Sequence, residues 1–381
     1  MAFFDNLLDD THLAMREMAR RFALKEIRPL AEAWEEAGTF PRELYKTAAS
    51  AGLLGVGFPE EVGGSGGGYL HTVMAVEGLM AGGSTGVIAS LGSLAIGLPA
   101  VLQTGDAALI DRFARPCFRG DKIACLAITE PGTGSDVAAV RTRATRDGDH
   151  YVVNGAKLYI TSGVRADFIN TLVRTADDPH GGLSFVMIER DTPGVSVSRA
   201  LRKTGWWASD TAELAFDDAR VPVANLIGGE GSGFFTLMRN FQTERLGLAA
   251  YGVATAQLAL DESLAWVRER KAFGRPIVGF QVTRHKLADM ASRVLAAQSL
   301  TYQVAARMDA GEYLVKEVSI AKNLAAETAV SVCYDAVQLF GGMGYMRETL
   351  VERLSRDARL LPIGGGTQEI MKEIIAKQLG L

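Results

Sequence analysis

The stretch "HYVVNGAKLYITS", residues 150–162, decides the fold class, because it is a strand pattern that lies between two long regions of helical pattern. It belongs to a set of short apolar runs that Gly, Asp and Pro turns separate, which is a texture typical of antiparallel strands. The other runs are "KIACLAITE" (122–130), "FINTLVRT" (168–175), "LSFVMIER" (183–190) and "TAELAFDD" (211–218). The middle of the chain is therefore predicted to be antiparallel β.

Helical patterns flank this region on both sides. Leu13, Met18, Phe22 and Ile27 recur at helical spacing near the start, and long helical patterns return after about residue 230, at 245–273 and 316–342. We therefore predict an α+β fold with three closely packed parts, because neither a repeat nor a Pro-rich linker separates them. The parts are an N-terminal helical domain (1–121), a middle antiparallel β domain (122–231) and a C-terminal four-helix-type domain (232–381).

Composition narrows the class of protein. The chain has 381 residues, 48% of them hydrophobic and 22% charged, and a formal net charge of −4, so no global field attracts nucleic acid or an anionic membrane. Cys117, Cys125 and Cys333 form no CxxC pair, which indicates neither a zinc site nor a disulfide framework. Acidic residues in the first 17 positions are atypical of targeting peptides. We expect no metal, no nucleic-acid partner and a reducing, cytoplasmic location.

Residues 78–105 carry no charge over a length that could cross a bilayer. Seven glycines, several serines and Pro99 interrupt the stretch. We favour small-residue helices packed inside the protein over a membrane span, and we expect no stable membrane insertion.

The glycine clusters, among them "GGSGGG", "GGEGSG" and "GGMG", do not complete a G-x-G-x-x-G between a strand and a helix, so a Rossmann unit is disfavoured. The segment "LAITEPGTGSD", residues 126–136, follows a strand and gathers Thr129, Ser135 and free backbone N–H groups in a tight turn. Such a turn can present donors to a flavin ring or a phosphate, although on its own it is more often only a turn.

Several motifs in order, "AITEPGTGSD", "NGAKLYITSG", "DTAELAFDD", "ERKAFGRPIVGFQ", "QLFGGMGY" and "GGGTQEIMKEIIA", resemble the acyl-CoA dehydrogenase family over essentially the whole chain. The resemblance is greatest to its long-chain and isovaleryl-type branch. It implies FAD as the cofactor, the fold predicted above, and an assembly of four chains as a dimer of dimers.

The resemblance also implies which residues hold the FAD. One group lines the flavin ring, and Thr161 lies near its N5 edge; a second group reaches the FAD of a neighbouring subunit; a third lies beside the last helix. Arg270 next to Lys271 suits a pyrophosphate, since a guanidinium binds phosphate oxygens in pairs, but such a run is equally typical of a solvated helix end. The residues are Leu126, Ile128, Thr129, Gly134, Ser135, Tyr159, Ile160 and Thr161; Arg270, Phe273, Gln281, Gln338, Leu339, Gly341 and Gly342; and Thr367 and Glu369.

The catalytic carboxylate is absent from its more familiar position. Where the medium-chain branch has Y-E-G-T, this chain has Gly364, Gly365, Gly366 and Thr367. The long-chain and isovaleryl-type enzymes instead carry a Glu before an Arg-Leu pair, and "FQTERLG" offers Glu244 there. No charged residue occurs from Leu246 to Leu260, so we expect the helix that Glu244 opens to be buried and the Glu244 pKa to be raised. The alternative is that Glu244 caps a helix N-terminus.

Gly365 is predicted to keep the backbone N–H that, in this family, hydrogen-bonds the thioester oxygen, while its missing side chain leaves room for the relocated carboxylate. The alternative is a flexible turn. Further substrate contacts implied by the resemblance are Ser135, His180, Gly181, Phe235, Gln242, Arg245 and Gly366. Trp206 and Trp207 stand where relatives often have polar or basic residues, and the sequence leaves open whether they lie at a surface or in the core.

The resemblance thus implies an FAD-dependent enzyme that converts an acyl-CoA to a trans-2-enoyl-CoA and passes electrons to an electron-transferring flavoprotein, in a bacterial cytoplasm. Two alternatives stay open: a flavin oxidase or monooxygenase on the same fold, and a catalytically silent CoA-binding subunit. Acyl chain length, branching, the physiological electron acceptor and the pathway cannot be read from the sequence.

Overall fold

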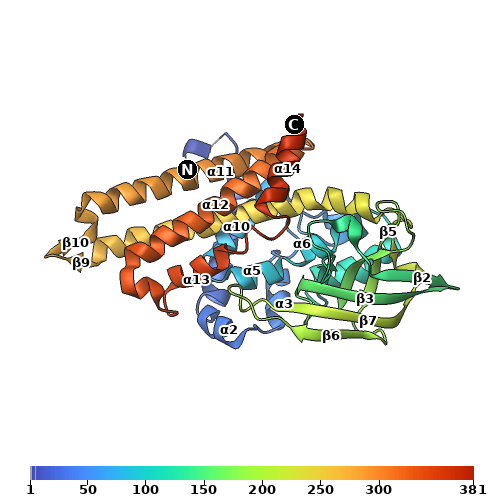
Figure 1. The fold of residues 1–381 in the computed structure, drawn as a ribbon. Helices are drawn as coiled ribbons and strands as arrows, with labels where there is room; N and C mark the ends of the chain where they lie inside the picture. Colours follow the sequence, from blue (N-terminus) through green and yellow to red (C-terminus); the bar gives the residue numbers. More distant parts are fainter. Residues whose placement is uncertain (1, 5) are drawn as a thin grey trace.

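The computed structural model describes residues 2–4 and 6–381. Its elements follow the predicted order of helices, strands and helices (Figure 1). The N-terminal helices are α1 (Asp10–Phe22), α2 (Ala31–Ala37), α3 (Glu43–Ser50), α4 (Tyr69–Met80), α5 (Thr85–Leu91), α6 (Leu94–Gly97), α7 (Pro99–Leu102), α8 (Ala107–Leu109) and α9 (Arg115–Phe118).

The charge-free stretch 78–105 forms the end of α4 and helices α5, α6 and α7. Most of its residues are buried against the rest of the protein, as predicted for internal small-residue helices. In the part of the chain that the structure describes, no helix is both long and apolar enough to cross a membrane.

The middle strands form one eight-stranded sheet. Strands β4 and β5 are buried on both faces and accordingly read as continuous apolar runs, whereas the edge strand β6 is mostly exposed. The strands are β1 (Ala124–Ala127), β2 (Arg143–Asp147), β3 (His150–Thr161), β4 (Phe168–Arg174), β5 (Leu183–Glu189), β6 (Val195–Ala200), β7 (Thr211–Pro222) and β8 (Leu226–Ile227), in the order β6-β7-β3-β2-β4-β5-β8 with β1 also on β4.

The sheet is not purely antiparallel, which corrects the prediction for this region. β1 pairs with β4 in parallel from Ala124 opposite Phe168 onward, and β2 meets the far end of β4 in parallel at Arg143 opposite Arg174. β1 and β2 therefore occupy successive places along one edge of β4, and the chain leaves the sheet between them. That excursion is the turn at residues 128–142, so the departure from the antiparallel pattern lies at the predicted flavin turn.

The C-terminal helices are α10 (Gly233–Glu269), α11 (Gln281–Asp309), α12 (Val315–Phe340), α13 (Leu350–Ala358) and α14 (Gln368–Gln378), with a short hairpin of β9 (Lys271–Ala272) and β10 (Arg275–Pro276) between α10 and α11. The three long helices run side by side, and the hairpin lies at their end, away from the large sheet (Figure 1).

Helices α10 and α12 approach very closely. A Cβ atom at Gly252 would lie only 2.7 Å from the carbonyl oxygen of Ala325, so this crossing requires glycine. The facing positions are mostly Ala, Gly and Val, which bury α10 over much of its length. The charge-free run 246–260 is thus explained by helix packing.

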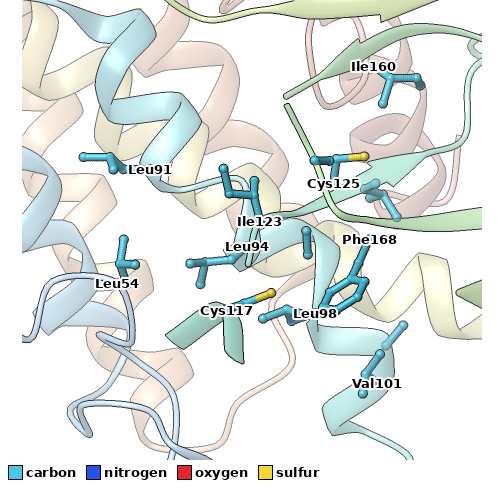
Figure 2. Close-up of a cluster of buried hydrophobic side chains, with 14 of the residues drawn as sticks. Leu54, Leu91, Leu94, Leu98, Val101, Cys117, Ile123, Cys125, Ile160 and Phe168 are labelled. Carbon is cyan, nitrogen blue, oxygen red and sulfur yellow. The ribbon is translucent and has the colours of Figure 1, made fainter. Parts of the chain in front are cut away.

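A continuous apolar core joins the N-terminal helices to the sheet. Leu91, Leu94 and Leu98 belong to the same buried cluster as Cys125, Ile160 and Phe168 of the strand region, and Figure 2 shows Leu98 next to Phe168. All three cysteines are buried free thiols. The domains share one interior, so side chains from all three can be held at fixed positions around a common site.

Candidate active site

Glu244 lies in the fourth turn of α10, not at its start. The helix begins at Gly233, because nothing in "GFFTLMRNFQT" interrupts it, so the expectation that Glu244 opens the helix is wrong and the capping alternative is excluded. Burial raises the pKa of Glu244 to about 7, although the charges of Arg245 and Lys322 oppose that rise. Its Oε2 atom has no hydrogen-bond partner among the residues that the structure describes.

The glycine segment faces this carboxylate. A Cβ atom at Gly365 would lie 3.5 Å from Glu244 Oε1 and would overlap Leu248 Cδ1. Gly365 and Gly366 have φ values of +64° and +103°, which favour glycine. A side chain at Gly365 would therefore enter the space beside Glu244, and the backbone there is already in a conformation that suits glycine.

Two buried cations hold the glycine segment in place. Arg245 Nε donates to the carbonyl oxygen of Gly365 (3.4 Å), and Lys322 Nζ donates to that of Gly366 (2.7 Å). Burial, followed by the charge of Arg245, lowers the pKa of Lys322 to about 8. Lys322 was not among the residues predicted from the sequence; the available signal was a lysine within the mostly small and apolar stretch "SIAKNLAA" of α12.

The predicted flavin turn and strand β3 lie side by side. Leu158 N–H donates to the carbonyl oxygen of Thr129 (2.8 Å), and Lys157 Nζ donates to that of Ile128 (2.9 Å). Lys157 also pairs with Glu130 at 2.9 Å in the interior. Burial alone would raise the pKa of Glu130, but Lys157 and the hydrogen bonds to residues 141 and 142 lower it overall. This buried pair, which was not predicted from the sequence, fixes the shape of the turn.

The outer side of this turn is open. Cβ atoms at Gly132 and Gly134 would meet no heavy atom within 4 Å in the described chain, and Ser135 is exposed. Tyr159 is 66% exposed and has a φ of +61°, which is unusual for a non-glycine residue. Leu126 and Ile160 are buried, and Thr161 is half-buried opposite Thr211 of β7. The turn and Tyr159 therefore form a surface that a planar ring could cover.

Helix α6 and its neighbours connect this turn with α10. Ser93 Oγ donates to the carbonyl oxygen of Ala124 at the start of β1 (3.1 Å). On the other side, Asn240 Nδ2 donates to the carbonyl oxygen of Ile96 (3.2 Å). These bonds hold β1 and α10 on either side of residues 93–97.

The predicted CoA contacts gather near the start of α10. Asp178 accepts hydrogen bonds from the N–H groups of His180 and Gly181, and the His180 ring lies 4.5 Å edge-on from Phe234. Phe235 is 65% exposed in the first turn of α10. Gln242 is buried, and its Oε1 has no partner among the described residues.

A second set of predicted cofactor residues lies at the hairpin end of the long helices. Arg270 is the C-cap of α10, and its backbone N–H donates to the carbonyl oxygen of Trp266. The Arg270 guanidinium lies 6.0 Å from the Trp266 ring, which stacks on Phe340 with ring centroids 4.5 Å apart. Phe273 is 94% exposed. Gln281, Gln338, Gly341 and Gly342 are exposed at this end too, and Leu339 is half-buried. By helix rise, Arg270 lies about 39 Å along α10 from Glu244, so one chain does not bring these two sets together.

Thr367 caps α14 by accepting from the N–H of Ile370 (3.4 Å), and Glu369 is exposed in the first turn. Beside them, a surface hollow of about 580 Å³ is lined by Gln368, Pro362 and residues of α11 and α12. Neither Glu244 nor the flavin turn contributes to that hollow.

The tandem tryptophans divide between core and surface. Trp206 is buried, and its backbone N–H donates to Asp357 Oδ1 (2.6 Å). The backbone N–H of Trp207 donates to Glu35 Oε2 (3.0 Å), and the Trp207 ring lies against the guanidinium groups of Arg347 (4.3 Å) and Arg356 (3.8 Å). The pair therefore ties the β domain to the helices on both sides.

The three domains thus bring together a carboxylate with a buried, unpartnered oxygen, a glycine backbone that faces it and an open turn on the sheet. Three family models match the chain in sequence: the acyl-CoA dehydrogenase N-terminal domain at residues 9–121, the middle domain at 125–219 and the C-terminal domain at 231–380. The chain belongs to the acyl-CoA dehydrogenase family.

Individual relatives agree with this assignment over nearly the full length. An acyl-CoA dehydrogenase of Bacillus subtilis is 40% identical over 367 residues, which cover 96% of this chain and 97% of that protein. The crystal structure of a probable acyl-CoA dehydrogenase from Mycobacterium abscessus is 53% identical, with a TM-score of 0.96 and coverage of 98% of this chain and 100% of that one. A putative acyl-CoA dehydrogenase from Mycobacterium smegmatis is 50% identical, with a TM-score of 0.97 and coverage of 99% of each chain.

Family membership makes the chain an oxidoreductase that uses FAD. The residues present fit that cofactor, because the turn at 126–135 keeps an open face at Gly132 and Gly134 and Tyr159 stands exposed beside it. The fold class predicted from the sequence is confirmed by the domain order and by the match to solved structures.

Proposed function

We propose that the chain removes a proton from the α-carbon and a hydride from the β-carbon of an acyl-CoA thioester, giving a trans-2-enoyl-CoA, with Glu244 as the base. The observation that carries the proposal is the Glu244 carboxylate, whose Oε2 is buried without a described partner and whose Oε1 faces the Gly365 backbone. This arrangement supports assignment to the long-chain and isovaleryl-type branch, in which α10 supplies the carboxylate.

Glu244 suits the transfer of a proton near neutrality. Burial raises its pKa to about 7, so the carboxylate can take a proton from carbon and release it again without a large cost in either direction. The general base must be ionised before the reaction, so turnover should rise with pH through this value.

Arg245 and Lys322 position the backbone opposite the base. Each cation binds one of the two successive carbonyl oxygens of Gly365 and Gly366, which limits rotation of these peptide planes. We propose that the Gly365 N–H then donates to the thioester oxygen, stabilising the negative charge that develops as the α-proton leaves. Gly366, Gln242 and Ser135 are proposed as further substrate contacts.

The turn at Leu126, Ile128, Thr129, Gly134 and Ser135 and the segment Tyr159 to Thr161 would hold the flavin ring, with Thr367 and Glu369 at the start of α14. When bound, FAD supplies the acceptor for the hydride from the β-carbon. The chain's own contribution is a rigid, partly buried wall, which Glu130 and Lys157 keep in shape.

A second copy of the chain would complete each cofactor site. Arg270, Phe273, Gln281, Gln338, Leu339, Gly341 and Gly342 lie at the far end of the long helices, about 39 Å from Glu244 by helix rise. They are therefore proposed to bind the FAD of a neighbouring subunit, in a homotetramer built as a dimer of dimers. Sedimentation of the purified holoenzyme measures this; a monomer that retains full activity would exclude the shared site.

His180, Gly181 and Phe235 are proposed to contact the CoA portion, because they gather where α10 begins. Electron transfer to an electron-transferring flavoprotein and a bacterial cytoplasmic location are part of the same proposal. Mixing the reduced enzyme with such a flavoprotein and recording reoxidation of the flavin tests the partner.

The deciding experiment is anaerobic mixing of the yellow holoenzyme with a series of acyl-CoA thioesters while the visible flavin absorbance is recorded. Bleaching without oxygen supports dehydrogenation. An absolute need for oxygen and an external reductant would instead indicate a monooxygenase, and rapid peroxide formation in air would indicate an oxidase. A preparation that binds CoA thioesters but never bleaches would indicate a silent binding subunit.

A further inference from the structure

On the face of α10 that carries Glu244, the next turn borders open space and the turn after it carries Tyr251. Gly247, Leu248 and Tyr251 follow Glu244 by three, four and seven positions and therefore share its face of the helix. A Cβ atom at Gly247 would meet no heavy atom within 4 Å in the described chain. One turn after the carboxylate there is thus room for another group.

Tyr251 follows Gly247 by one helical turn on the same face of α10. Its hydroxyl donates to the carbonyl oxygen of Ile88 in α5 (3.3 Å), so the side chain reaches from α10 to the N-terminal helices. A Cβ atom at Gly92 would lie 2.9 Å from the same hydroxyl, and the Trp206 ring lies 6.2 Å from the Tyr251 ring. Burial raises the pKa of the phenol well above its usual value, so it stays protonated as a donor. The ring is held on several sides.

The direction of the acyl group follows from the proposed function, on which this inference rests. His180 and Phe234, at the proposed CoA side, lie at the start of α10. A thioester that enters there and passes Glu244 in the fourth turn continues toward Gly247, Leu248 and Tyr251. We propose that Tyr251 is the floor of the acyl site and limits the enzyme to acyl groups of about six carbons or fewer.

The limit follows from helix geometry. Seven residues of α10 advance about 10.5 Å, and both side chains lean toward the helix N-terminus, so the carboxylate and the ring stay about that far apart along the axis. Van der Waals contact with the ring takes up about 3.5 to 4 Å. About 7 Å remain, which is room for some four or five carbons beyond the α-carbon at about 1.3 Å each, from a bond length of about 1.5 Å at tetrahedral angles.

The test compares butanoyl-CoA, hexanoyl-CoA and dodecanoyl-CoA with the purified holoenzyme, using anaerobic flavin bleaching and steady-state kcat/KM with an artificial acceptor. We expect hexanoyl-CoA to be favoured over dodecanoyl-CoA by at least about 100-fold, since surplus methylenes that a pocket cannot hold each cost a large factor. In Tyr251→Gly, the ratio of kcat/KM for dodecanoyl-CoA to that for hexanoyl-CoA should rise at least about 10-fold. Tyr251→Phe keeps the ring and should keep the wild-type ratio.

Gly247→Val provides a measurement that does not depend on how Tyr251 variants fold. Its side chain enters the open space directly, so the ratio for hexanoyl-CoA to butanoyl-CoA should fall about 10-fold. Equal use of dodecanoyl-CoA and hexanoyl-CoA by the wild type, or unchanged ratios in Tyr251→Gly and Gly247→Val preparations that retain flavin, would overturn the length limit alone. Failure of every thioester to bleach the flavin would overturn the proposed function as well.

Discussion

The single variant Glu244→Gln tests two claims: that Glu244 is the catalytic base, and that its burial as a charged group lowers the stability of the fold. Gln has nearly the same shape but cannot accept a proton at neutral pH. Positioned general bases contribute about 10²- to 10⁴-fold to a rate, so we expect kcat to fall by at least about 100-fold at pH 8. The flavin content should be unchanged, because the proposed flavin contacts lie on other elements.

The same variant should be more stable than the wild type in alkaline solution. Each pKa unit corresponds to 1.36 kcal/mol, so the rise of the Glu244 pKa from 4.5 to about 7 means that ionised Glu244 destabilises the fold by up to about 3 kcal/mol. The folded chain holds this proton more tightly than the unfolded chain. Wild-type stability therefore decreases as the pH rises from 4.5 to about 7, and the full penalty remains above that range.

The assay pairs turnover with thermal unfolding of the holoenzyme at pH 5 and pH 8. The wild type and Glu244→Gln should unfold at more similar temperatures at pH 5 than at pH 8, where the variant should unfold at the higher temperature. Glu32→Gln on the exposed face of α2 is the matched control, in which turnover and the pH dependence of unfolding should match the wild type. Wild-type turnover in Glu244→Gln would refute the catalytic assignment, and an identical stability difference at the two pH values would refute the burial argument.

Two further predictions concern the buried lysines. Lys322→Met removes the donor to the Gly366 carbonyl oxygen, which should lower the free energy of unfolding by about 2 kcal/mol. It also removes a positive charge that lowers the Glu244 pKa, so the pH midpoint of turnover should move upward. The pH profile of kcat measures this midpoint, and an unmoved midpoint would contradict the prediction. Lys157→Met leaves Glu130 buried without its ion pair, which should lower the free energy of unfolding by about 3 to 5 kcal/mol and cause loss of bound flavin. Adding Glu130→Gln should restore part of the stability and part of the flavin content. Unfolding and flavin absorbance measure the two effects, and a Lys157→Met protein as stable as the wild type would argue against a structural role for the pair.

The order of helices and strands could be predicted from the sequence because periodicity and turn residues are local signals. The parallel pairing of β1 and β2 with β4 could not, since it depends on where the chain returns after the turn at 128–142. The start of α10 was predicted too late, because the charge-free run 246–260 stands out in the sequence and the earlier part of the helix does not. The eleven residues before Glu244 are helical, but no side-chain cap marks where the helix begins.

For the candidate site, motif resemblance located Glu244, the glycine segment and the flavin turn. It did not find Lys322, Lys157 or Tyr251, because each acts through a partner that is distant in sequence. Lys322 binds a carbonyl 44 positions away, and Tyr251 binds one 163 positions away. Such pairings become visible only when the helices are packed.

The length of α10 has a consequence for genetics as well as for assembly. In the proposed arrangement each chain supplies the base for one site and the phosphate-binding arginine for its neighbour's. A Glu244→Gln chain and an Arg270→Ala chain, both inactive alone, would then complement each other when co-expressed, because one site of every mixed dimer inherits both intact residues. Random mixing should restore about a quarter of wild-type activity, and sites wholly contained in one polypeptide would restore none.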